Sequence, residues 1–289
     1  MHKIPTVRAV PSLVCFYTMM AIAMSVDAEE KRPIDGIMDN SFFIEEAYNQ
    51  EEGIVQHIFN GVYGREKFVH GGTRTFDASF TQEWPVMSQT HQFSYTVPYG
   101  FVWGEGQSAN GVGDVLLHYR YQAYLDTNSL TAFSPRMSLV LPTGAFDKGF
   151  GNHTLGYQWN LPFSTTFRDR WFLHLNAGLT YLPGAGAQPT RDLLSYNLGG
   201  SVIYCVNDRF NLMCEWVGNW NQDVANNGRL ERQFSSVISP GVRYAINPKD
   251  ETQIVLGLAT PFGITRSAPD IGAFLYFSFE HRLFGNKTD

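Results

Sequence analysis

The sequence carries little charge and has no long apolar run beyond its first residues. Charged residues make up 17% of the 289 residues, below the roughly 25% of ordinary soluble domains. No stretch of about 18 apolar residues follows the N-terminal segment, which argues against a helical membrane protein. The net charge of -6 is mild and argues against nucleic acid as a partner.

Metal-binding and catalytic patterns are missing as well. No spacing of histidine, cysteine and aspartate is typical of a metal cage, so we expect neither a metal nor another cofactor. Twelve-stranded lipid hydrolases of outer membranes place a histidine two residues before a serine, because residues two apart on a strand point the same way. No His-x-Ser occurs here, and we expect no enzyme. Serine–histidine pairs across strands stay open.

The N-terminus is typical of a secretory signal peptide. A weakly basic start precedes the apolar run Ser12–Met24, and Val26-Asp27-Ala28 predicts cleavage after Ala28. A membrane anchor is the alternative, but the apolar run is short and interrupted. The predicted organisation is a signal peptide (1–28), an N-terminal segment (29–53) and a barrel (54–289). After cleavage two cysteines remain, Cys205 and Cys214. The exported chain enters an oxidising compartment, in which disulfides can form.

The residues that are abundant favour a membrane barrel. Aromatics are 15% and glycines number 27, yet mean hydropathy is only -0.19. A barrel with a lipid-facing apolar surface and a polar lumen has this composition, because the average conceals both faces.

Apolar and polar residues alternate along most of the chain. Phe93 to Trp103 and Leu155 to Phe167 are two of the strongest runs. Most runs have ten or more residues, as tilted membrane strands need, whereas strands of a soluble sandwich, the alternative, average about five or six. Aromatics that match two interfacial girdles lie near the run ends: Trp103, Trp171, Tyr181, Tyr196, Tyr204, Trp220, Phe234 and Tyr244.

The charged residues in these runs are sorted to one face. In the strands from Asp114 to Arg243 every ionisable residue lies in the polar register, and a charge facing lipid costs about 2–4 kcal/mol. We expect inward charges to form a constriction that selects solutes; the alternative is that they are ion pairs filling a narrow barrel. The lumen candidates are Asp114, His118, Arg120, Arg136, His174, Glu215, Arg243, Glu280 and Arg282.

The links between runs predict the topology. Short turns at 168–170, 207–209 and 247–250 alternate with longer links at 104–113, 143–153, 182–192, 221–232 and 263–270. This predicts an all-β, transmembrane, antiparallel up-and-down β-barrel of about 12 strands, with the short turns and both ends in the periplasm. Cys205 then faces the lumen and Cys214 faces lipid, so no disulfide forms. The last strand ends in Arg282-Leu283-Phe284, which resembles the terminal signal read by the barrel assembly machinery.

Several segments resemble a known family. They are Phe93–Tyr99, Gly111–Val115 and Ser138–Gly144, with Ile44–Glu51 as an N-terminal motif. The pattern resembles the outer-membrane transporter family of the putative meta-pathway of phenol degradation. The resemblance covers most of the predicted mature chain and implies a transporter-type β-barrel that passes small, aromatic or hydrophobic compounds.

Residues 29–53 are acidic and do not alternate. They are expected to fold inward as a plug or to lie in the periplasm. In the first case Glu45, Glu46, Tyr48 and Gln50 line the pore entrance; the alternative is a solvated leader.

The predicted function is passive transport of small solutes across the outer membrane. The expected partners are outer-membrane lipid, small-molecule solutes and the assembly machinery. One alternative is a structural or adhesive barrel that acts through polar surface loops, such as the loop with Asp223, Asn226 and Asn227. An outer-membrane lipid hydrolase is the third reading.

Overall fold

The computed structural model describes residues 41–66, 72–104, 107–186, 190–224, 229–249 and 252–283. The predicted signal peptide (1–28), residues 29–40 and Phe284 lie outside the described residues. The described part is built from strands, with one short 3-10 helix, η2 (Phe146–Lys148). No helix in that part is long and apolar enough to cross a membrane.

The described residues contain seventeen strand segments in one antiparallel sheet. The segments are β1 (Ile54–Arg65), β2 (Arg74–Val86), β3 (Ser88–Gly104), β4 (Gln107–Val112), β5 (Leu116–Tyr121), β6 (Tyr124–Asp126), β7 (Thr131–Phe133), β8 (Arg136–Val140), β9 (Gly156–Asn160), β10 (Phe163–Arg168), β11 (Trp171–Ala185), β12 (Arg191–Asn207), β13 (Phe210–Val224), β14 (Leu230–Lys249), β15 (Thr252–Ala259), β16 (Phe262–Gly263) and β17 (Ile271–Arg282).

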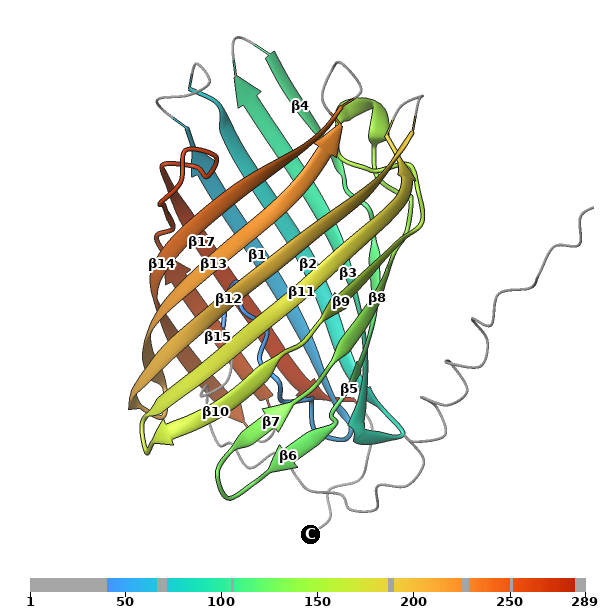
Figure 1. Cartoon of the computed structure of the whole chain (residues 1–289). Coiled ribbons are helices and arrows are strands. Elements are labelled where there is room, and N and C mark those ends of the chain that lie inside the picture. Colours follow the sequence, from blue (N-terminus) through green and yellow to red (C-terminus); the bar gives the residue numbers. More distant parts are fainter. Residues whose placement is uncertain are drawn as a thin grey trace, which may run out of the picture. The chain divides into compact units, whose positions relative to one another are not determined.

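The sheet closes into a barrel of twelve strands, which confirms the predicted fold. Successive short segments share one barrel strand: β4 with β5 and β6, β7 with β8, β9 with β10, and β15 with β16. The first and last strands, β1 and β17, pair along their whole length and complete the closure. Figure 1 shows the tilted strands around the barrel.

Strand residues alternate between the interior and the outer surface. On β13, Asn211, Met213 and Glu215 are buried, whereas Leu212 and Cys214 are exposed. Cys205 is buried and both cysteines are free, as the predicted opposite faces require. The outer surface is dominated by exposed apolar side chains, among them Leu175, Leu198, Ile238, Leu256, Leu258 and Leu275. An apolar wall around a polar interior suits a lipid bilayer.

The links at one end of the barrel are short, as predicted. β10 and β11 are joined through residues 169–170, and β12 and β13 through 208–209. At the other end three predicted links are too long. Residues 107–112 form β4, β11 and β12 reach Ala185 and Arg191, and β13 and β14 reach Val224 and Leu230. These strands continue as polar hairpins, whose cross-strand hydrogen bonds need no apolar alternation.

The link between β8 and β9 folds back against the inner wall. Phe150 lies over Gly100 of β3, where an added Cβ would be 2.4 Å from the Phe150 ring. Asp114 fixes the same link, because its carboxylate accepts hydrogen bonds from the backbone N–H groups of Gly144 (2.9 Å) and Asn152 (2.8 Å). Asp114 therefore anchors an inward-folded loop.

Candidate functional site in the barrel interior

Residues 41–50, here called the interior segment, run inside the barrel without regular secondary structure. Ala47, Tyr48, Asn49 and Gln50 are at most 1% exposed. A buried irregular chain leaves its backbone N–H and C=O groups without regular partners, so the wall must supply them. The polar inner faces of the surrounding strands meet this requirement, as the next contacts show.

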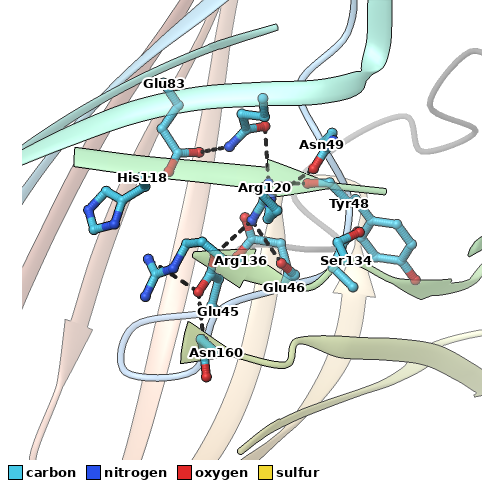
Figure 2. Close-up of polar contacts among 12 residues, drawn as sticks. Glu45, Glu46, Tyr48, Asn49, Glu83, His118, Arg120, Ser134, Arg136 and Asn160 are labelled. Atoms are coloured by element: carbon cyan, nitrogen blue, oxygen red, sulfur yellow. Dashed lines mark hydrogen bonds and ion pairs between the residues drawn. The ribbon is translucent and has the colours of Figure 1, made fainter. Parts of the chain in front are cut away.

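Arg120 on β5 is the main anchor of the interior segment (Figure 2). Its guanidinium donates to the Asn49 side chain (2.8 Å), the Glu46 carbonyl (3.0 Å) and the Tyr48 carbonyl (2.7 Å). It also donates to Glu45 (3.2 Å) and to Gln92 on β3 (3.1 Å). A guanidinium has five N–H donors in a fixed fork, and these five hydrogen bonds use that geometry.

Glu45 links two arginines that the sequence analysis assigned to the lumen. Its Oε1 lies 3.2 Å from Arg120 and its Oε2 lies 3.3 Å from Arg136 on β8. Oε2 also accepts from Asn160 at 2.7 Å. Arg136 is 19% exposed and Glu45 17%, so this ion pair meets the remaining lumen, unlike the buried Arg120. Glu45, which forms an ion pair with both arginines, therefore belongs to the interior segment rather than to a strand.

Glu215 on β13 holds the other end of the interior segment. One carboxylate oxygen accepts from the backbone N–H groups of Phe42 (3.0 Å), Phe43 (3.0 Å) and Ile44 (3.2 Å). Phe42 stacks on Phe274 with ring centroids 5.0 Å apart. The wall provides room for this ring at Gly257, where an added Cβ would lie 2.4 Å from it.

Asn176 on β11 imitates a backbone partner for Glu45. Its Oδ1 accepts from the Glu45 N–H at 2.8 Å, and its Nδ2 donates to the Glu45 carbonyl at 2.7 Å. Two glutamines of the barrel wall bind Gln50. The Gln92 side chain accepts a hydrogen bond from the Gln50 N–H (2.8 Å), and the Gln56 side chain accepts one from the Gln50 side chain (2.6 Å).

Two serine–histidine pairs lie across strands, a possibility that the sequence left open. Ser164 and His174 are 2.7 Å apart, and so are Ser138 and His118. All four side chains are at most 3% exposed. The Ser164 hydroxyl also accepts from the Ala47 N–H at 2.8 Å. A nucleophile must be reachable by its substrate, so these pairs hold structure rather than present a reactive hydroxyl.

The structure places the other predicted lumen residues in separate environments. Arg243 is fully buried on β14 opposite Asn211. Glu280 accepts from Gln56 at 2.7 Å, and Arg282 donates to the Glu52 carbonyl at 3.3 Å.

Of the four predicted entrance residues, Glu45 and Glu46 line the cavity, and Glu45 forms ion pairs with Arg120 and Arg136. Glu46 is 9% exposed, and burial raises its pKa to about 7 against the opposing effect of Arg120. The Tyr48 hydroxyl donates to the Leu130 carbonyl in the β6–β7 link, and Gln50 is buried. These three residues hold the interior segment in place.

Sequence reasoning missed Glu83, Gln92 and Asn176 as interior residues. Glu83 on β2 accepts from Gln92 at 2.8 Å beside Arg120 (Figure 2). The signal was present, because Asp77, Ser79, Thr81 and Glu83 alternate with Phe76, Ala78, Phe80 and Gln82. Glu83 precedes the strands from Asp114 to Arg243 in which charge predicts the inward face, and amides carry no charge from which a face can be predicted.

A cavity of about 510 Å³ lies beside the interior segment. Its floor includes Glu45, Arg120 and Arg136. Amide and hydroxyl side chains from many strands form much of its wall: Asn60, Thr81, Thr96, Gln158, Thr180, Asn197 and Asn219. In the part of the chain that the structure describes, no three histidine, cysteine or carboxylate side chains are grouped to hold a metal ion.

Comparisons with known proteins agree with the fold. No family model and no curated protein matches the chain, so the resemblance to the meta-pathway transporters rests on the quoted segments alone. Among solved structures, the COG4313 outer membrane channel from Pseudomonas putida F1 matches with a TM-score of 0.65 at 12% identity, over 81% of this chain and 97% of that one. At this identity the match shows a shared barrel fold.

Two further matches are weaker. The NanC porin matches with a TM-score of 0.49 at 11% identity, over 78% of this chain and 100% of that one. The CymD monoaromatic hydrocarbon channel matches at 0.42 and 11%, over 82% and 90%.

Proposed function

We propose that the protein is an outer-membrane channel for small solutes, with the interior segment as its gate. The supporting observation is the pairing of a polar cavity with a chain segment that is held by side chains rather than by a strand ladder. Side-chain bonds of this kind break individually, whereas the barrel wall opens only by losing a continuous ladder. The interior segment is therefore the part of the lumen that moves at least cost.

The outer-membrane location follows from the same architecture. The apolar outer wall needs lipid, and a predicted signal peptide directs the chain out of the cytoplasm. We accordingly propose membrane lipid and the barrel assembly machinery as partners. The barrel ends that carry the short links face the periplasm in this proposal.

The lining of the cavity bears on the solute. The family resemblance implies aromatic or hydrophobic compounds, but the wall presents amides and hydroxyls such as Asn60, Thr81 and Asn197. Such groups form hydrogen bonds with a polar solute. A hydrocarbon would displace the water bound to them without replacing its hydrogen bonds, which costs free energy. We therefore propose small hydrogen-bonding solutes, aromatic ones with polar substituents included.

Planar-bilayer recording of the refolded full chain tests the channel proposal. We expect small or infrequent conductance steps, and larger and frequent steps in a variant that lacks residues 41–50. Liposome uptake of a small sugar and of benzoate compares the two solute classes. A deletion variant that folds as a barrel, yet neither conducts nor admits either solute, would overturn the proposal.

Charge selection is tested at Arg136, which is partly exposed beside Glu45. Arg136→Gln should shift the reversal potential toward cation preference, because it leaves Glu45 as the exposed charge of this pair. An unchanged reversal potential would remove Arg136 from the selecting region. The matched control is Arg168→Gln, at the exposed β10–β11 turn.

A further inference from the structure

Two histidines meet on the outer surface where the barrel closes. His57 is on β1 and His281 is on β17, the first and last strands, which pair with each other. His57 lies two residues before the exposed Phe59, and His281 four residues after the exposed Phe277, so both share the outward face. Both are near the strand ends at Ile54 and Arg282, at the barrel end with the short links.

The ring nitrogens are separated by a distance that suits a shared metal ion. The two Nε2 atoms are 3.3 Å apart, a distance at which one ring can also donate a long hydrogen bond to the other. Zinc–imidazole bonds of about 2.0–2.1 Å at a tetrahedral angle place two nitrogens about 3.3–3.4 Å apart. Adjacent ligands of a square-planar ion with bonds of similar length would lie about 2.8–2.9 Å apart. The separation of the two Nε2 atoms therefore matches that of two ligands of a tetrahedral zinc ion.

The second ring nitrogen of His281 supports the same reading. Nδ1 of His281 lies 3.3 Å from the Arg282 carbonyl, which accepts its proton in the matching tautomer. That tautomer leaves Nε2 with a free lone pair. Metal-binding histidines commonly donate their other ring N–H to a backbone carbonyl in this way, which fixes the ring orientation.

Aromatic neighbours restrain both rings. His57 is stacked between Phe80 (6.2 Å between centroids) and Phe279 (6.0 Å). The two imidazoles are themselves nearly parallel, at 25° and 5.4 Å. Restrained ligands lose little rotamer freedom when a metal binds, which favours affinity.

We propose that His57 and His281 form a two-histidine site for a divalent transition metal, with Zn²⁺ as the best-fitting ion and water in its remaining positions. The ion would link the first strand to the last and so stabilise the closure of the barrel at this end. With two protein ligands the site would exchange its metal rather than bury it, unlike a closed structural site with four ligands. The site is independent of the proposed channel activity.

The test uses untagged, refolded full chain in detergent micelles, titrated with Zn²⁺ against a chromophoric chelator at pH 7.5. We expect one ion per chain, and at least a tenfold loss of affinity in both His57→Gln and His281→Gln. Binding should also fall strongly at pH 5, because a protonated imidazole is no ligand. His91→Gln is the matched control: His91 lies on the same outward face with its ring 2.7 Å from the Tyr119 hydroxyl, and its loss should leave affinity unchanged.

A second measurement protects the test against a misfolded variant. The gel mobility of unheated protein reports the closed barrel. We expect Zn²⁺ to raise the temperature at which the wild-type barrel unfolds and its gel mobility changes. Neither histidine variant should show this shift. Absence of Zn²⁺ binding by wild type, or binding that survives both substitutions in barrels that still close, would overturn the proposal and leave the pair as part of an aromatic girdle.

Discussion

Replacement of Arg120 by alanine should release the interior segment while leaving the barrel closed. Four of the five hydrogen bonds described above for Arg120 reach the interior segment, through Glu45, Glu46, Tyr48 and Asn49. The fifth reaches Gln92 on the neighbouring β3. None belongs to the backbone ladder of β5, so the strand pairing with β3 and β8 does not depend on this side chain.

The magnitude follows from what the substitution leaves behind. Removing one partner of a buried ion pair costs about 3–5 kcal/mol, because the other groups stay buried without compensation. Glu45 keeps Arg136, which favours the lower part of this range. At about 1.4 kcal/mol per factor of ten, docking of the interior segment should weaken by roughly two to three orders of magnitude.

Hydrogen exchange of residues 42–50 in the micelle-bound protein measures this docking directly. Arg120→Ala should accelerate exchange there while the strands stay protected, and channel openings should become frequent. The control is Arg136→Ala, which loses one partly exposed contact with the segment, worth about 1 kcal/mol or less. Equal exchange rates in wild type and Arg120→Ala would refute the anchoring role of Arg120.

Three further outcomes are expected. The docked segment raises the pKa of Glu46 to about 7 through burial. Docking therefore favours protonated Glu46 and weakens as pH rises from about 4.5 to 7. Conductance should rise over that range, and Glu46→Gln should reduce this pH dependence. Leu275→Arg, on the outer wall, should cost about 2–4 kcal/mol in urea unfolding from liposomes if it lies at mid-membrane, whereas an unchanged midpoint would contradict lipid contact. A membrane-soluble thiol reagent should label the exposed Cys214 in the folded protein and the buried Cys205 only after unfolding, as mass spectrometry can show.

The barrel was predictable because its signal repeats in nearly every strand. A period of two over ten or more residues fixes strand faces, and the cost of charge in lipid fixes which face is outside. Glu215 and Arg243 illustrate this, because their register alone predicted the interior positions that the structure shows. Hairpin ends such as residues 107–112 escaped prediction because polar residues outside lipid carry no alternation.

The interior segment was harder to predict because it has no periodicity at all. Its conformation is set by partners far along the chain: Phe42 by Glu215, Ala47 by Ser164 and Gln50 by Gln92. None of these pairs is separated by fewer than forty residues. A single sequence holds the inventory of donors and acceptors but not their matching. For that reason the sequence is compatible with both a plug and a solvated leader for the acidic stretch 29–53.

The matching changes what the sorted lumen charges mean. A face that is polar along every strand predicts the lining of a passage, because polar groups that point away from lipid are typical of a water-filled lumen. In the structure, Arg120, Glu215 and Asn176 use their polar groups in hydrogen bonds to the backbone of residues 42–49. Only side chains such as Arg136 and Glu45, which border the cavity with part of their surface exposed, are left to meet a solute. Selection among solutes therefore depends on a few residues at the edge of the interior segment, whereas most lumen charges decide whether the passage is open.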